Sequence, residues 1–200
     1  MNARVLIVKI LLPLLLLATL GMLATLPHLV TADDQGQNDG NHHQTEHASL
    51  AVFQVRLEGD LQVPPVSTEA FGFVLVRLFQ NGTSSAIDFR LIVCDIANVT
   101  HAHIHVGAAG ANGNITVPFF DQPLSPVSST HACIVLAHGV RGPTNLEPRP
   151  AEGIADWTDF VHALLSGDTY VNVHTTAHPA GEIRGQLVSE PEQEDDQGDE

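Results

Sequence analysis

Three histidines alternate along the segment THAHIHVG, residues 100–107. Successive side chains of an extended strand point to opposite faces, so His101, His103 and His105 share one face. Imidazole nitrogens bind metal ions such as Zn²⁺ and Cu²⁺, and they exchange protons near neutral pH. The spacing is therefore compatible with a metal site, a proton-transfer site or a structural polar cluster.

A second segment, TYVNVHT at residues 169–175, repeats the alternation. Tyr170, Asn172 and His174 fall on one face, and two valines fall on the other. Opposite side chains on neighbouring strands lie ~5 Å apart. If the two segments pair, His174 meets the histidines of the first segment.

Three interpretations of this cluster stay open. The first is a metal site formed by His103, His105 and His174, with an open coordination position that suits Zn²⁺ or Cu²⁺. The second is a hydrogen-bonded cluster on an outer face, and the third is proton transfer by exposed imidazoles. The pattern favours the second, because His-x-His alone is weak evidence for metal. The supporting polar residues would be His101, Tyr170, Asn172, Glu182 and Arg184, the last two as a surface ion pair of little energetic weight.

Alternating apolar residues predict the strands that position these side chains. Turn-forming residues separate the predicted strands. The strands are predicted at residues 51–59, 71–79, 86–93, 100–106, 114–120, 131–137, 169–175 and 181–188.

One segment, DWTDFVHALLSG at residues 156–167, has helical spacing instead. Asp156 suits the N-cap, and Gly167 follows the predicted end. Together these elements predict an all-β fold, an antiparallel β-sandwich (immunoglobulin-like or similar) with one short helix.

The two ends of the chain have a different composition. Residues 1–32 combine Arg4 and Lys9 with a long apolar run and small residues before position 33, as a cleaved signal peptide does. The alternative is an uncleaved N-terminal helix that anchors the protein in the membrane. We expect residues 33–49 to be a disordered polar linker, residues 50–188 to fold, and residues 189–200 to be a disordered acidic tail.

The charge of the chain excludes nucleic acid as a partner. Asp and Glu number 23 against eight Lys and Arg, and Arg4 and Lys9 belong to the predicted signal peptide. So acidic a surface repels phosphate backbones. We also expect no contact with the membrane after signal cleavage.

Export bears on two further features. Cys94 and Cys133 are the two cysteines, and an even pair in an oxidising compartment predicts a disulfide rather than two buried thiols. Asn81, Asn98 and Asn114 begin Asn-x-Ser/Thr sequons, which are glycosylation sites if the host modifies exported proteins.

Four blocks of the sequence resemble the CHRD domain, the module named after chordin. They are LEGDLQVPPV, THAHIHVGAAGANG, LLSGDTYVNVHT and PAGEIRGQL, in the family's order, within residues 50–188. Gln62 departs from the glutamate usual in the family, residues 121–152 are longer and less regular, and chordin's cysteine-rich modules are absent. The resemblance implies an extracellular β-sandwich-like module, and it does not transfer growth-factor binding.

The resemblance and the lack of a nucleophile–base signature in the sequence predict a secreted or surface-exposed, non-catalytic binding module. Its partner would be an extracellular protein or the matrix. The alternative is an extracytoplasmic Cu- or Zn-binding protein, an oxidoreductase similar to superoxide dismutase.

Overall fold

The computed structural model describes residues 49–121 and 127–189. The predicted signal peptide, residues 33–48 of the predicted linker and residues 190–200 of the predicted tail lie outside the described residues. Within the described ranges, no helix has both the length and the apolar character needed to cross a bilayer.

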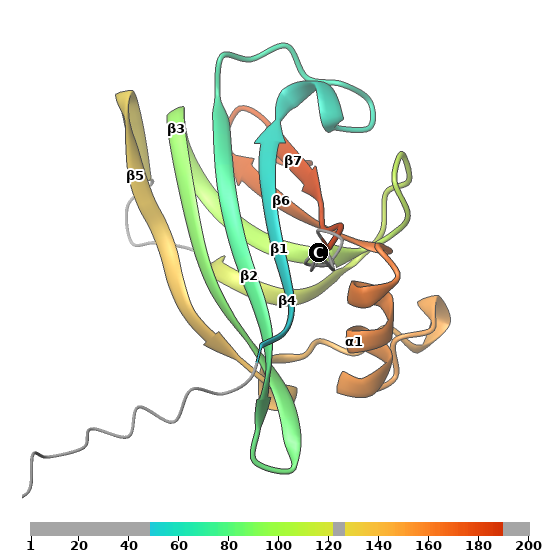
Figure 1. Ribbon diagram of the computed structural model, residues 1–200. Helices are drawn as coiled ribbons and strands as arrows, with labels where there is room; N and C mark the ends of the chain where they lie inside the picture. Colours follow the sequence, from blue (N-terminus) through green and yellow to red (C-terminus); the bar gives the residue numbers. More distant parts are fainter. Residues whose placement is uncertain (1–48, 122–126, 190–200) are drawn as a thin grey trace, which may run out of the picture. The chain divides into compact units, whose positions relative to one another are not determined.

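The described chain forms seven strands and one α-helix (Figure 1). Three short 3₁₀ turns lie in the connections. In chain order the elements are β1 (Ser49–Glu58), β2 (Phe71–Asn81), β3 (Ser84–Val106), β4 (Ile115–Asp121), β5 (Val127–Arg141), α1 (Trp157–Leu165), β6 (Thr169–Thr175) and β7 (Ile183–Gln186).

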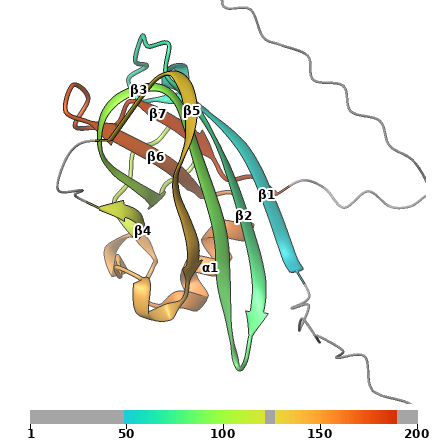
Figure 2. The ribbon, with the colours of Figure 1, turned by 90° about the vertical axis from the view of Figure 1, so that its left-hand side faces the viewer.

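All strand pairings are antiparallel, in the order β2-β1-β7-β6-β3-β4. Because β2 also pairs with β3, the sheet closes on itself in a barrel-like ring, and β5 extends it from β3. Figure 2 shows β5, β3, β2 and β1 side by side, with α1 at one end. The predicted all-β antiparallel fold with one short helix is confirmed, and the immunoglobulin-like sandwich stays a prediction.

Strand β3 differs from the prediction of two separate strands. It runs through residues 94–99 between them, with left-handed backbone at Asp95 (φ 48°) and Asn98 (φ 54°) and register shifts on either side. Asp95 accepts the His131 backbone N–H, and the Asn98 N–H donates to Ser128 Oγ, so the bulged residues stay hydrogen-bonded. The first half of β3 pairs with β2 and the second with β6, so one strand belongs to both parts of the ring.

Alternation places the core where the sequence predicted it. Ile87, Phe89, Leu91 and Val93 of β3 are buried, and the Phe89 ring stacks on Phe119 of β4 at 3.8 Å between centroids. The apolar residues of β1, β2, β6 and β7 complete one cluster. Burial of this apolar surface is the main source of stability.

Helix α1 covers one end of this core with Trp157, Phe160 and Leu164. It begins as predicted, because the Asp156 carboxylate accepts the backbone N–H groups of the second and third helical residues. It ends before Gly167, whose φ of 76° favours glycine.

A disulfide joins Cys94 of β3 to Cys133 of β5, as predicted. The two residues lie opposite each other in the β3–β5 ladder. The bridge ties β5 to the strand that also carries His103 and His105.

Candidate metal centre

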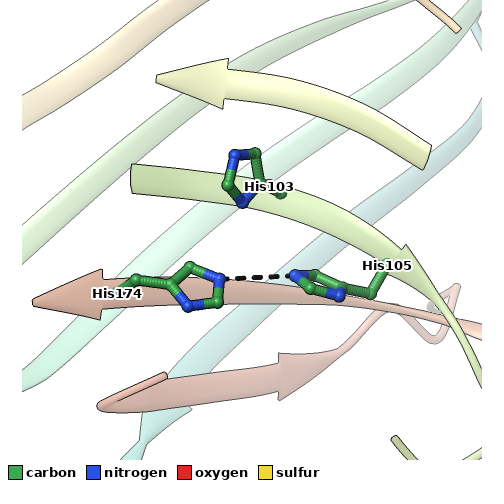
Figure 3. A group of neighbouring side chains, drawn as sticks. All are labelled: His103, His105 and His174. Atoms are coloured by element: carbon green, nitrogen blue, oxygen red, sulfur yellow. Dashed lines mark hydrogen bonds between the residues drawn. The ribbon is translucent and has the colours of Figure 1, made fainter. Parts of the chain in front are cut away.

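Three imidazole rings converge between β3 and β6. The two strands are neighbours, with His101 opposite His174 and His103 opposite Asn172. One nitrogen each of His103, His105 and His174 lies within 4.8 Å of the other two (Figure 3). The pairing that the sequence analysis assumed therefore exists, and the three residues meet on one face.

Hydrogen bonds fix the tautomers of two of the rings. His105 Nδ1 lies 3.0 Å from the Gly113 carbonyl oxygen, and His174 Nδ1 lies 3.0 Å from the Pro179 carbonyl oxygen. A carbonyl only accepts, so each Nδ1 carries the proton and donates it. In the neutral ring each Nε2 is consequently unprotonated and carries a free lone pair.

In the third ring, that of His103, Nε2 is hydrogen-bonded and Nδ1 is the unprotonated nitrogen. His103 Nε2 lies 2.8 Å from Asp121 Oδ1, and the carboxylate accepts the Nε2–H. His103 Nδ1 is buried and has no hydrogen-bond partner among the described residues. A buried nitrogen lone pair without a hydrogen-bond donor costs free energy.

The distance between two of the nitrogens suits a metal ion. His105 Nε2 and His174 Nε2 are 3.4 Å apart, joined by the dashed line in Figure 3. Two nitrogens bound tetrahedrally to Zn²⁺ at 2.0–2.1 Å are separated by about 3.3–3.4 Å. Metal-binding histidines also typically donate their other N–H to a carboxylate or a backbone carbonyl, as all three rings do here.

Burial keeps the cluster uncharged at neutral pH. It lowers the pKa of His105 and the pKa of His174 to about 4, because desolvation disfavours the imidazolium and the neighbouring rings would repel a second charge. Burial also lowers the pKa of His103, although the Asp121 carboxylate opposes the shift. A neutral imidazole is the form that binds a metal ion.

The burial itself corrects the sequence analysis, which placed the cluster on an outer, solvated face. The exposed fractions are 5% for His103, 6% for His105 and 8% for His174. Two connections bring hydrogen-bond acceptors onto this face, the loop at residues 107–113 and the turn at residues 178–181. The alternation sets the face of the strand, whereas these loops decide its exposure.

Glycines allow both connections to approach closely. A Cβ on Gly113 would collide with the Val106 carbonyl oxygen, and a Cβ on Gly181, at φ 122°, would collide with the Asn172 amide. The carbonyl of Gly113 is the acceptor that fixes His105. Gly113 is therefore part of the site through its backbone.

Tyr170 and Arg184 hold the loop at residues 107–113 in place. The Tyr170 ring stacks on His105 at 5.0 Å, and its hydroxyl accepts the Gly113 N–H at 3.1 Å. The Arg184 guanidinium lies 3.5 Å from the centre of the Tyr170 ring and donates to the Ala111 carbonyl oxygen at 2.9 Å. Burial lowers the pKa of Arg184.

The predicted surface pair of Glu182 and Arg184 is wrong. Both side chains are buried and have separate partners, because loops cover this face. The Glu182 carboxylate accepts the hydroxyls of Thr68 and Thr175, each at 2.7 Å. Glu182 thus ties the segment before β2 to β6.

Asn172 links the two sides of the same face. Its Oδ1 accepts Gln62 Nε2–H at 2.6 Å, and its Nδ2 donates to the Ala180 carbonyl oxygen at 3.2 Å. A glutamate at position 62 would have no N–H for this bond. The departure at Gln62 therefore has a local structural role next to the turn that anchors His174.

Sequence analysis missed Asp121, Gly113 and Pro179, which orient the three rings. Two of these act through backbone carbonyls, which carry no residue-type signal. Asp121 reaches His103 because β4 pairs with β3 and sets His101 opposite Asp121, a register that the sequence did not reveal. The sequon residues Asn81, Asn98 and Asn114 are exposed, and their glycosylation stays a prediction.

Comparison with known proteins gives one match. The family model described as the CHRD domain covers residues 53–187. The chain belongs to the CHRD domain family. No curated protein and no solved structure matches it. The histidine cluster of this CHRD domain lies wholly inside the matched region, and its disulfide fits an oxidising environment.

Proposed function

We propose that this CHRD domain is an extracytoplasmic binding module that holds one Zn²⁺ or Cu²⁺ ion between His103, His105 and His174. One observation carries the proposal. The Nε2 atoms of His105 and His174 face each other, while both Nδ1–H groups are committed to carbonyls. A cation between the two lone pairs satisfies both.

The cluster without an ion is unfavourable in this form. Within the described part of the chain His103 Nδ1 has no partner, and the two facing Nε2 atoms are both acceptors at neutral pH. An unsatisfied buried acceptor costs about 1–3 kcal/mol. A bound divalent ion replaces these losses with three coordinate bonds, and the Asp121 carboxylate balances part of its charge.

The family membership supports a role in binding. The disulfide and the signal-like sequence of residues 1–32 support export. In this proposal the protein is secreted or displayed on the cell surface, does not catalyse a reaction, and recognises an extracellular protein or the matrix. The ion stiffens the loops that carry Gly113 and Pro179.

The test measures metal content and affinity in the full chain, purified without a His-tag. Elemental analysis after Zn²⁺ or Cu²⁺ supplementation should give one tightly held ion, and isothermal titration should give a single strong site. H105Q and H174Q should each abolish that site while circular dichroism stays unchanged.

His162 provides the control, because it lies exposed on α1, whereas the three ligands lie on β3 and β6. H162Q should bind as the wild type does. The triple variant H42Q/H43Q/H47Q removes histidines from the predicted linker and should retain the strong site. A folded wild type without a tight site, or an H105Q variant that keeps it, would overturn the proposal.

A further inference from the structure

A fourth imidazole, His101, lies against the cluster. Its ring centroid is 5.6 Å from that of His103 and 6.4 Å from that of His174. The centroids of His103, His105 and His174 are separated from one another by 5.3–5.9 Å. His101 is thus almost as close to two of the ligands as they are to each other.

His101 differs from the other three in how its ring is held. Each of the others has one nitrogen fixed by Asp121, Gly113 or Pro179. Within the described residues, His101 makes ring contacts only, and it is half-buried. Rotation of its side chain therefore breaks no hydrogen bond, and solvent leaves room for the movement.

The backbone already directs His101 toward the site. It precedes His103 by two residues on β3, so it lies on the same face, and it is directly opposite His174 on β6. Zn²⁺ in closed protein sites has four ligands, and three fixed nitrogens leave one position to fill.

We propose that His101 turns inward when the metal binds and supplies the fourth nitrogen, so that four imidazoles surround the ion. This inference rests on the proposed function and deepens it. The ion then has no open position for water or substrate, which makes the site one of capture and structural support. It also separates this domain from metal enzymes, whose catalytic ions keep an open position.

The test uses Cu²⁺ as a spectroscopic probe in the full chain carrying H42Q/H43Q/H47Q, which we call the background protein. These substitutions keep histidines of the predicted linker from contributing to the signal. Electron paramagnetic resonance with pulsed nitrogen detection counts the bound imidazoles. Titration with azide asks whether a coordination position is open. The background protein, its H101Q variant and its H162Q variant are compared.

The background and H162Q proteins should show four imidazoles and a spectrum that azide leaves unchanged. H101Q should still bind one equivalent, about tenfold or more weakly, and show three imidazoles and a clear azide-dependent change. Three imidazoles with the same azide response in the background and H101Q proteins would overturn the role of His101 alone. Failure of the background protein to bind Cu²⁺ or Zn²⁺ would instead overturn the proposed function.

Discussion

The unprotonated Nε2 atoms of His105 and His174, on the paired strands β3 and β6, face each other at a distance of 3.4 Å. Neither nitrogen has a proton at neutral pH, because each ring donates its proton to a carbonyl and burial lowers both pKa values to about 4. Two acceptors held this way are a source of instability in the metal-free protein. This relationship leads to the first two predictions.

Metal ions should stabilise the protein. An ion that binds the folded state alone adds RT ln(1 + [L]/Kd), which is about 4 kcal/mol at a thousandfold excess over Kd. Zn²⁺ should raise the free energy of unfolding of the wild type by an amount of this order, and EDTA should reverse it. H174Q, measured by urea denaturation with and without Zn²⁺, should show no increase.

Acid should destabilise the metal-free protein from about pH 6.5 downward. The folded-state pKa values of His105 and His174 are lowered from 6.5 to about 4, so the folded state resists protonation that the unfolded chain accepts. The stability is fully present above pH 6.5 and is lost as the pH falls toward 4, by roughly 2–3 kcal/mol for each ring. Denaturant titrations in EDTA at several pH values should show this slope, and H174Q should flatten it.

Removing the carboxylate behind His103 should weaken metal binding without unfolding the protein. Asp121 is 53% exposed in its side chain, and its Oδ1 fixes the proton on His103 Nε2. Loss of such a partner typically costs 10–100-fold in metal affinity. Isothermal titration of D121A should give a Kd raised by about this factor, and an affinity equal to that of the wild type would contradict the role of Asp121.

Substitution of Arg184 should lower both the stability of the fold and the affinity for metal. R184M leaves the Ala111 carbonyl without its donor and the Tyr170 ring without its cation, so we expect a loss of roughly 2–3 kcal/mol. The loop that anchors His105 loosens at the same time, so the affinity for metal should fall. R90M is the matched control, since Arg90 is exposed, and it should change stability by less than about 0.5 kcal/mol.

The disulfide should contribute strongly to stability. Cys94 and Cys133 are 39 residues apart, and closing a loop of this length stabilises by about 4 kcal/mol in the chain-entropy model. Guanidinium denaturation with reductant should show this loss in the wild type. Reductant should not change the unfolding of C94A/C133A, and equal stability of oxidised and reduced wild type would refute the contribution.

Local patterns in the sequence were sufficient for much of the fold. The N-cap at Asp156, the end before Gly167 and the strand TYVNVHT all follow from short-range chemistry, and the structure has each of them. The continuous strand β3 did not follow, because its bulges depend on partners in β5 that lie 30 and 36 residues away. The sequence therefore predicts two strands, at residues 86–93 and 100–106.

The candidate site divides in the same way. The alternation of residues predicted that His103, His105 and His174 lie together, given the assumption that β3 and β6 pair, and the two strands do pair. It could not show that loops would bury them or that Asp121, Gly113 and Pro179 would fix their tautomers. Those contacts are long-range or involve backbone atoms, and neither kind leaves a pattern in residue types.

The bent strand β3 has a consequence for how the domain opens. It pairs with β2, β4, β5 and β6, carries the cysteine Cys94 and presents two of the three histidines. Detachment of any of these four strands therefore breaks hydrogen bonds to β3. Amide protons along β3 should exchange with deuterium only through global unfolding, with one common free energy of opening, whereas those of loops should exchange independently. A metal ion at one end of β3 would then slow exchange at Leu91, far along the same strand, as much as at its own ligands.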